Sequence, residues 1–253
     1  MEKFFFKKVN ATFAHFYTGR MKKTYKHIFF DLDHTLWDFE RNAEETKREM
    51  FEKFQLKDKG IESYERFRER YVGINQALWA MYREDKIEKE ELNFRRFYDT
   101  LILFGITDRR LGENMAAAFI KGITSKTYLF PYTRELLDYL YQKKYHLHII
   151  TNGFEEVQYG KLQNSGLRKY FTTVITSEAA GSKKPDSEIF IYALREAGAK
   201  ATESVMIGDD LEIDIAGARQ VEIDQIFVNH NSTKHNAEVT MEVFSLDEIM
   251  KIL

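Results

Sequence analysis

Hydrophobic residues recur at helical spacing through the first half of the chain. Between about residues 38 and 126 they stand three or four positions apart, which is the spacing of the buried face of a helix. One helical pattern ends near Gly105, and a shorter one runs from Leu111 to Phe119. No strand pattern interrupts this stretch, so we predict a block of helices over residues 38–126. Its longest apolar face consists of Ile61, Tyr64, Phe67, Tyr71, Ile74, Leu78 and Met81.

Short apolar runs alternate with helical patterns on either side of that block. Strands that alternate with helices in this way form a parallel sheet with helices on both faces. The predicted fold is therefore α/β, a doubly wound, Rossmann-like parallel sheet that carries an inserted helical domain. The predicted strands are 25–30, 146–151, 172–176, 204–207 and 225–228, and the predicted helices of this part are 135–142, 155–164, 186–197, 213–219 and 243–253.

These patterns divide the chain into three parts. Residues 21–37 and 127–253 form the predicted α/β core, and residues 38–126 form the helical insert. Residues 1–20 are basic and aromatic with weak periodicity, and we predict that they are an N-terminal extension. Met21 leads directly into the first strand, so a natural start at Met21 is one interpretation and an amphipathic arm is another.

Polar side chains follow the predicted strands at their carboxyl ends. In a doubly wound sheet these ends meet at one edge, where ligands bind. A buried strand that ends in two nearby carboxylates also calls for a cation, because desolvating one anion beside another is costly. In chain order the polar residues are Asp31 and Asp33 after the first strand, Thr151 and Asn152 at the end of the second, Lys184 after the third, and Asp209 and Asp214 after the fourth.

This set of groups suits the transfer of a phosphoryl group. Mg²⁺ is usually held by a few carboxylates, water and substrate phosphate, so Asp31, Asp33 and Asp209 are candidate Mg²⁺ ligands. A carboxylate beside the metal can attack phosphorus and form an aspartyl-phosphate. Thr151 and Lys184 can bind the transferring oxygens and offset their charge. Asp33 can protonate the leaving alkoxide and then deprotonate the attacking water.

The four segments resemble the four motifs of the haloacid dehalogenase-like (HAD) hydrolase superfamily. Order and spacing match over about residues 25–230, and the helical block resembles the cap that closes over the site and selects the substrate. The matching segments are Asp31-Leu-Asp-His-Thr35, Thr151-Asn-Gly153, Lys184 before Pro185, and Gly208-Asp-Asp followed by Asp214.

The resemblance implies a role for each matching residue. Asp31 would be the nucleophile and a Mg²⁺ ligand. Asp33 would be the acid/base, and its main-chain oxygen would also bind the metal. The other implied roles are Mg²⁺ binding by Asp209, an auxiliary position near the metal for Asp214, and substrate binding by Thr151, Asn152 and Lys184.

Two local features bear on the substrate and on the choice of lysine. The superfamily's first motif usually has Gly before its Thr, where this chain has His34. The variant DLDHTLWDFE is similar to members of the pyrimidine 5′-nucleotidase branch, which act on nucleoside monophosphates. Lys183 and Lys184 are adjacent, and we choose Lys184 because it abuts Pro185. Candidates for stacking on a nucleobase, or for the core of the cap, are Trp37, Phe39, Trp79 and Tyr82.

Composition narrows the class of protein. With 38 basic and 40 acidic side chains, the net charge is −2, and this balance does not favour nucleic acid as a partner. There is no cysteine, which excludes disulfides and thiolate metal sites and fits a reducing cytoplasm. No apolar run approaches the about 20 residues that a membrane span needs. We expect a cytoplasmic monomer or homodimer that acts on a small phosphorylated metabolite.

The predicted function is a Mg²⁺-dependent phosphomonoesterase, more finely a 5′-nucleotidase for pyrimidine nucleoside monophosphates. A phosphatase of another small metabolite, such as phosphoglycolate or a sugar phosphate, stays open, as does a sugar-phosphate mutase, which shares every motif. A 2-haloacid dehalogenase needs no metal and lacks the second acid of the first motif, so Asp33 argues against it. The presence of every reactive group argues against a binding module without catalysis.

Overall fold

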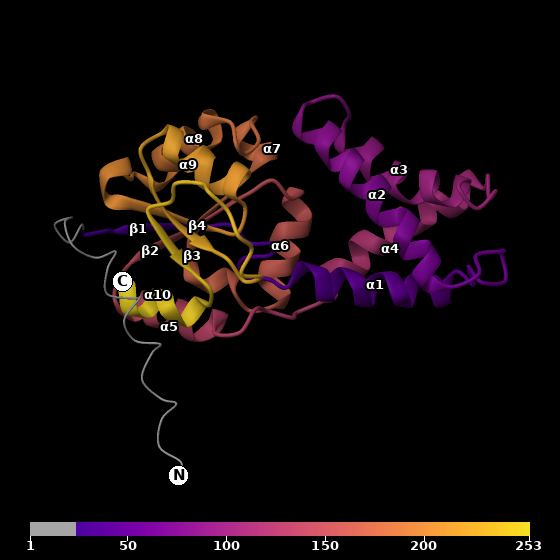
Figure 1. Cartoon of the computed structure of the whole chain (residues 1–253), viewed down its shortest axis with the longest axis horizontal. Helices are drawn as coiled ribbons and strands as arrows, with labels where there is room; N and C mark the ends of the chain where they lie inside the picture. The colour runs from indigo at the N-terminus through magenta and orange to yellow at the C-terminus, as the bar shows by residue number, and fades with distance from the viewer. Residues whose placement is uncertain (1–23) are drawn as a thin grey trace, which may run out of the picture.

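A computed structural model of the protein describes residues 24–253, so the predicted extension 1–20 lies outside the described residues. These residues form a sheet domain and a bundle of helices beside it (Figure 1). The six strands are parallel throughout, in the order β3-β2-β1-β4-β5-β6. The strands are β1 His27–Phe30, β2 His146–Thr151, β3 Phe171–Thr176, β4 Ser204–Gly208, β5 Asp224–Val228 and β6 Met241–Val243.

Helices cover both faces of the sheet. Side chains of a strand point alternately to its two faces, so an apolar strand has hydrophobic side chains on both faces, and each face is covered by helices. Ile28 and Phe30 of β1 belong to one hydrophobic cluster, beneath which α5 and α10 pack, and Phe29 belongs to the other, beneath α8 and α9 (Figure 1). The α/β fold predicted from the sequence is confirmed. The core helices are α5 Thr133–Gln142, α6 Glu155–Asn164, α7 Ser177–Ala180, α8 Ser187–Ala197, α9 Ala216–Gln220 and α10 Leu246–Ile252, with shorter turns η1 Arg168–Tyr170, η2 Ala201–Glu203 and η3 Leu211–Ile215.

Four helices fill the interval predicted as a helical insert. They are α1 Phe39–Lys53, α2 Tyr64–Arg83, α3 Lys89–Ile102 and α4 Arg109–Ser125. Side chains at their N-termini explain where three of them begin, since Asp38, Ser63 and Asp108 each accept a hydrogen bond from a free backbone N–H of the first turn. We call this bundle the cap.

The cap joins the core at two neighbouring crossings of the chain, before α1 and after α4. The side chain of Asn42 is fully buried between them. It donates to the carbonyl oxygens of Asp38 at 2.6 Å and Tyr128 at 2.8 Å, and it accepts from the Tyr128 N–H at 3.1 Å. One amide side chain therefore ties both crossings together.

Most predicted elements agree closely with the structure, and β2 and α6 have the predicted bounds. The prediction of a helix from residue 243 was wrong at its start. Val243 is the last residue of the edge strand β6 and pairs with Val228, and α10 begins at Leu246. A strand of three residues is too short to show an alternating pattern. Among residues 24–253, no helix has the length and apolar character that a membrane crossing requires.

Candidate active site

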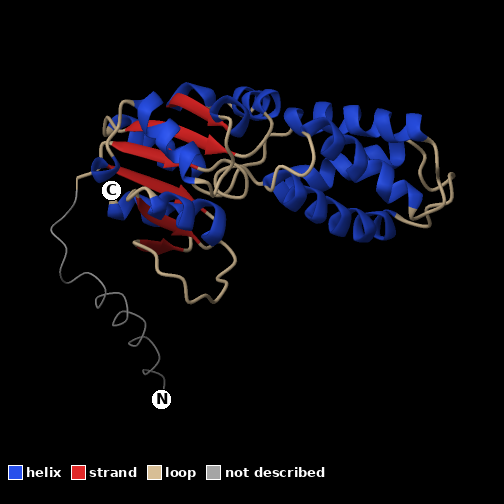
Figure 2. Cartoon of the chain, turned by 90° about the horizontal axis from the view of Figure 1, so that it is seen from above, coloured by secondary structure: helices blue, strands red, loops and turns tan. Residues whose placement is uncertain are grey.

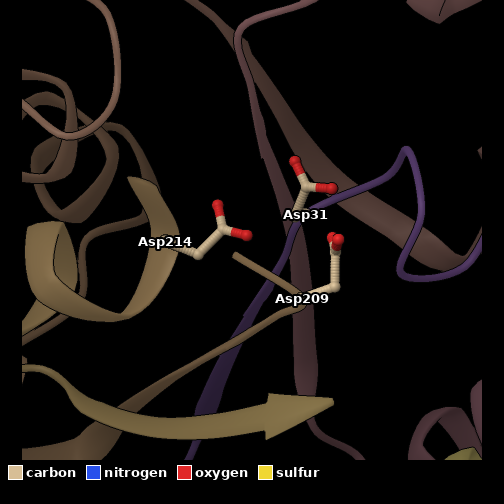
Figure 3. Close-up of side chains that lie close together, drawn as sticks. All are labelled: Asp31, Asp209 and Asp214. Atoms are coloured by element: carbon tan, nitrogen blue, oxygen red, sulfur yellow. The ribbon is translucent and has the colours of Figure 1, made fainter. Parts of the chain in front are cut away.

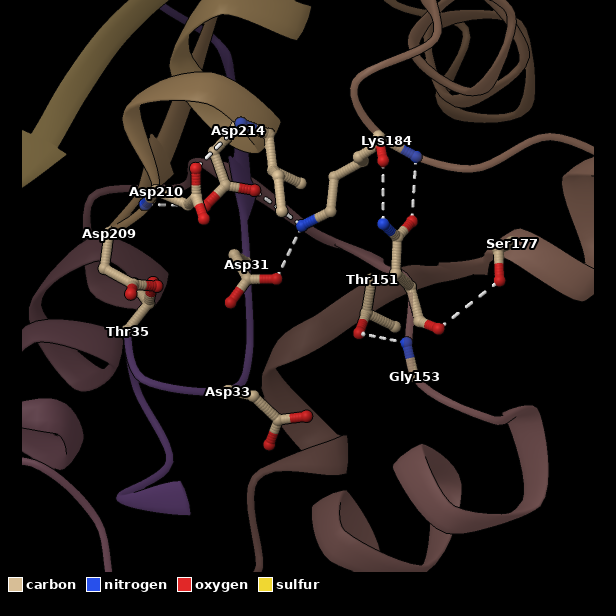
Figure 4. Close-up of polar contacts among 12 residues, drawn as sticks. Asp31, Asp33, Thr35, Thr151, Gly153, Ser177, Lys184, Asp209, Asp210 and Asp214 are labelled. Carbon is tan, nitrogen blue, oxygen red and sulfur yellow. Dashed lines mark hydrogen bonds and ion pairs between the residues drawn. The ribbon is translucent and has the colours of Figure 1, made fainter. Parts of the chain in front are cut away.

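The carboxyl ends of the strands point toward the cap (Figure 2). β1 lies between β2 and β4, so the residues that follow these three strands are neighbours. The N–H of Asp31 still donates to the Ile207 carbonyl of β4, at 2.9 Å, which holds the start of the loop against the sheet. The predicted site residues are thereby brought together at one edge of the sheet (Figure 4).

Three carboxylates, of which Asp31 and Asp214 are buried and Asp209 is half-buried, form a compact group at this edge (Figure 3). One oxygen from each of Asp31, Asp209 and Asp214 lies within 4.8 Å of the others. Burial, and then repulsion by Asp214, raises the pKa of Asp209 to about 7. Burial is also the main cause that raises the pKa values of Asp31 and Asp214. Such a group of oxygen donors fits a divalent cation, which would favour the ionised carboxylates.

Lys184 supplies a positive charge inside this group. Its Nζ lies 2.6 Å from Asp31 Oδ1 and 2.6 Å from Asp214 Oδ1, and the side chain is 2% exposed. Burial acts to lower the pKa of the Lys184 ammonium, but the two carboxylates outweigh it and raise the pKa above its ordinary value. The side chain of Lys183 lies away from these carboxylates, and its ammonium pairs with Asp85 of the cap. The structure thus places Lys184, and not its neighbour, beside the carboxylates.

Asp33 points away from this group toward helix α6. Lys161 Nζ lies 2.7 and 2.8 Å from the two carboxylate oxygens of Asp33, and Gln158 Nε2 donates to Oδ2 at 3.0 Å. The same Gln158 nitrogen donates to Thr151 Oγ1 at 2.7 Å. Burial lowers the pKa of Lys161, although Asp33 opposes that effect. The Asp33 side chain is therefore held apart from the three carboxylates, and binding of a metal by the main-chain oxygen of Asp33 stays a prediction.

Lys161 and Gln158 were missed by the sequence analysis. They stand three residues apart in a predicted helix, where lysine and glutamine are normally solvated. A usable signal was their position among the apolar residues Val157 and Leu162, which marks the buried face of α6. Polar residues on a buried face need partners, and here the partner is a site residue.

Asn152 and Thr151 already have partners in this structure. The Asn152 amide donates to the Lys184 carbonyl at 2.8 Å and accepts from the Lys184 N–H at 2.8 Å, so it fixes the loop that carries the lysine. Thr151 Oγ1 also accepts from the Gly153 N–H at 3.1 Å. Their predicted contact with substrate phosphate stays a prediction.

The fourth motif is held by hydrogen bonds within its own turn. Asp214 accepts at Oδ2 from the Asp210 N–H at 3.2 Å. Asp210 caps the following turn by accepting from the N–H groups of Glu212 and Ile213, both at 2.9 Å. Thr35 donates to Asp209 Oδ1 at 2.9 Å, which fixes that carboxylate beside Asp31.

The loop after β1 also accounts for His34. Its φ is 65°, in the left-handed region that favours glycine, and histidine is one of the few other residue types that adopt it with some frequency.

Trp37, proposed as a stacking residue, is fully buried, with the Lys161 ammonium 4.5 Å from its ring centre. Phe39 is only partly buried, 5.1 Å from the His34 ring, and remains a candidate for base stacking.

Side chains of the cap contact the core next to this edge of the sheet. Trp79 of α2 stacks on Phe154, with ring centres 5.6 Å apart. Lys89 at the start of α3 pairs with two core carboxylates, Glu156 at 2.7 Å and Glu178 at 3.0 Å. Exposed pairs of this kind contribute little stability each, so the contacts are compatible with an opening cap.

Comparisons with known proteins agree with this arrangement. A family model described as haloacid dehalogenase-like hydrolase matches residues 25–222. The chain is 33% identical over 232 residues to pyrimidine 5′-nucleotidase PynA of Streptococcus pneumoniae, covering 90% of this chain and 95% of that protein. It is 31% identical over 229 residues to pyrimidine 5′-nucleotidase YjjG of Escherichia coli, covering 89% and 96%.

The fold has a close counterpart among solved structures. The putative HAD-hydrolase YfnB of Bacillus subtilis, bound to magnesium, superposes with a TM-score of 0.81 at 28% identity, over 91% of this chain and 99% of that chain. That structure reveals interdomain movement. The whole arrangement of sheet and cap is therefore shared, and not only the sheet.

Proposed function

The chain belongs to the haloacid dehalogenase-like hydrolase family, and on that premise we propose that it is a Mg²⁺-dependent 5′-nucleotidase for pyrimidine nucleoside monophosphates. The family assigns it to the hydrolases of phosphoric monoesters. The observation that carries the finer proposal is similarity along almost the whole chain, cap included, to two proteins named pyrimidine 5′-nucleotidases. The cap matters here because, in this proposal, it binds the nucleoside part of the substrate.

The proposed reaction begins at Asp31. Its carboxylate oxygen attacks phosphorus, the bond from phosphorus to the nucleoside oxygen breaks, and the electron pair stays on that oxygen, which takes a proton from Asp33. Asp33 then takes a proton from water, whose oxygen bonds to phosphorus as the bond to Asp31 breaks. Phosphate leaves and both aspartates return to their starting forms.

Other residues stabilise charge during these steps. Lys184, already beside Asp31, would bind a phosphoryl oxygen together with the Thr151 hydroxyl. The residues that would hold Mg²⁺ are Asp31, Asp209 and the main-chain oxygen of Asp33. When bound, the ion would offset the charge of the phosphoryl group and keep Asp31 ionised. Its fit rests on the three converging carboxylates.

The test is phosphate release from a panel of esters, with Mg²⁺ or with a chelator. The panel contains UMP, dUMP, dTMP, AMP, phosphoglycolate, a sugar phosphate and p-nitrophenyl phosphate. Asp31→Asn is expected to lower release by at least about 1,000-fold, since it removes the nucleophile. Asp58→Asn, at an exposed position in the cap, is the matched control and should keep full activity.

The outcomes separate the coarse proposal from the fine one. A preference for pyrimidine monophosphates that depends on Mg²⁺ supports both. Equal or better hydrolysis of phosphoglycolate or a sugar phosphate would replace the nucleotidase with another phosphatase. Conversion of a sugar phosphate to an isomer would identify a mutase. Activity that survives in Asp31→Asn would contradict the assigned nucleophile.

We also propose a cytoplasmic location, which the lack of cysteine supports.

A further inference from the structure

Two side chains of helix α6 hold the carboxylate of Asp33. We propose that Lys161 and Gln158 are positioning residues that aim this carboxylate at the oxygen of the leaving group. The inference rests on the proposed role of Asp33 as the acid, and it adds two residues outside the four motifs. It does not depend on which alcohol leaves.

The contact with Lys161 is short and enclosed. Its Nζ lies 2.7 and 2.8 Å from the two oxygens of Asp33, so the ammonium spans the carboxylate and restricts its rotation. Lys161 is 2% exposed, and its ammonium lies over the rings of Trp37 at 4.5 Å and Phe39 at 5.2 Å. A buried ammonium surrounded by aromatic rings and one carboxylate has little freedom to move.

Gln158 links Asp33 to the second motif. Its Nε2 lies 3.0 Å from Asp33 Oδ2 and 2.7 Å from Thr151 Oγ1, and the side chain is fully buried. A Cβ at Gly153 would lie 2.5 Å from two atoms of the Gln158 side chain. Glycine at this position therefore makes room for the glutamine, and the second motif and Gln158 work as one unit.

Asp33 itself is less constrained by other groups. Its side chain is 21% exposed, and the hydrogen bonds that hold it come from Lys161 and Gln158. The contacts from α6 therefore decide where this carboxylate points. Because a proton is transferred efficiently only over a hydrogen-bonded distance, the protonated carboxyl group of Asp33 would protonate the leaving oxygen poorly if it were displaced.

The chemistry of the leaving group gives a specific test. An alkyl oxygen, such as that of a nucleoside, leaves as a strongly basic alkoxide and needs a proton as its bond to phosphorus breaks. p-Nitrophenolate is a weak base and leaves without one. A residue that acts only through the acid should therefore affect alkyl esters and spare the aryl ester. A general structural defect would affect both.

We would measure kcat/KM for UMP and for p-nitrophenyl phosphate in Lys161→Met, Lys161→Arg and Gln158→Leu. This ratio reports the steps up to departure of the leaving group, so the later attack of water does not obscure it. We expect Lys161→Met to lower the value for UMP by about 10- to 100-fold, part of the full contribution of a general acid, and that for the aryl ester by less than about 3-fold. Lys161→Arg, which retains a cation, should recover much of the loss.

Two controls make the outcome decisive. Gln163→Leu, at an exposed position of the same helix, should change neither value, and thermal unfolding identifies any variant that has lost its fold. In the background of Asp33→Asn, Lys161→Met should have no further effect, because the two residues act as one. Equal losses on both esters in a folded variant, or losses that multiply in the Asp33→Asn background, would overturn the proposal.

Failure of the positioning role of Lys161 and Gln158 can be distinguished from failure of the nucleotidase proposal. If the wild-type protein prefers another alkyl phosphate, the pyrimidine specificity fails, and the same comparison is made between that alkyl ester and the aryl ester. If UMP is hydrolysed but the loss is equal for both esters, the nucleotidase stands and the positioning role fails.

Discussion

The residue pair His27 and His148, at the end of the sheet opposite the site, predicts that the core loses stability in mild acid. His148 is 1% exposed, with one ring nitrogen 3.1 Å from His27 Nδ1 and the other 2.7 Å from Thr173 Oγ1. Burial, and then the neighbouring histidines His27 and His146, lower the pKa of His148 from 6.5 to about 3. Protonation would place a buried cation where no carboxylate contacts its ring nitrogens.

The direction in which stability changes with pH follows from proton binding by the folded and unfolded chains. The unfolded chain takes up a proton at His148 near pH 6.5, whereas the folded protein does so only near pH 3. Stability from this residue is therefore complete above pH 6.5 and is lost as the pH falls toward 3, by about 4 to 5 kcal/mol in total. Between pH 7 and pH 5 the loss is about 2 kcal/mol.

The assay is urea unfolding of wild type and His148→Gln at pH 7 and pH 5. Glutamine keeps a donor and an acceptor but does not titrate. Groups outside the cluster of His27, His146 and His148 contribute equally to both proteins, so wild type should lose about 2 kcal/mol more than the variant over this range. His146→Gln, exposed on the same strand, removes only a smaller cause of the lowered His148 pKa, so this variant should keep most of the extra loss seen in wild type. Equal losses in wild type and His148→Gln would refute the reasoning.

Two further predictions concern the loop of the third motif and the packing behind it. Lys184→Met leaves two buried carboxylates without their cation, so we expect it to abolish phosphate release and to lower the free energy of unfolding by about 3 kcal/mol, whereas Lys183→Met should keep most activity. Urea unfolding and the ester panel measure both, and similar effects of the two changes would contradict the assignment. Gly217→Ala would place a Cβ 2.5 Å from a ring carbon of Phe190 and should cost about 1 to 3 kcal/mol in urea unfolding, and an unchanged midpoint would contradict this packing.

The parts of the site that could be predicted from the sequence lie at strand ends. A strand buried on both faces is an apolar run, so the polar residue that ends it stands out, as Asp31 does after β1 and Asp209 after β4. The alternation of strands and helices then fixes a parallel sheet, and a parallel sheet brings such ends together. The family expected from these motifs is confirmed by the match over residues 25–222.

Lys161 and Gln158 could not be predicted in the same way, because they come from the middle of a helix. The apolar neighbours Val157 and Leu162 indicate which face of α6 is buried, but what lies opposite that face is set by tertiary packing. β6 was missed for a different reason, since three edge residues carry too little pattern. The contacts of the cap with the core are likewise matters of packing between distant segments.

The residues that could be predicted from the sequence and those that could not belong to different parts of the proposed site, one for the phosphoryl group and one for the leaving group. In the proposed reaction the phosphoryl group is bound by Asp31, Asp209 and Lys184. These residues lie in loops at the ends of β1 and β4 and after β3, where short segments carry recognisable spacing. The leaving-group side has Asp33 held by α6 under the cap, and its partner Lys161 lies 128 residues away in the chain. Variation of activity with the alcohol should accordingly respond to changes in α6 and the cap, and the comparison of alkyl with aryl esters in Lys161→Met measures that dependence directly.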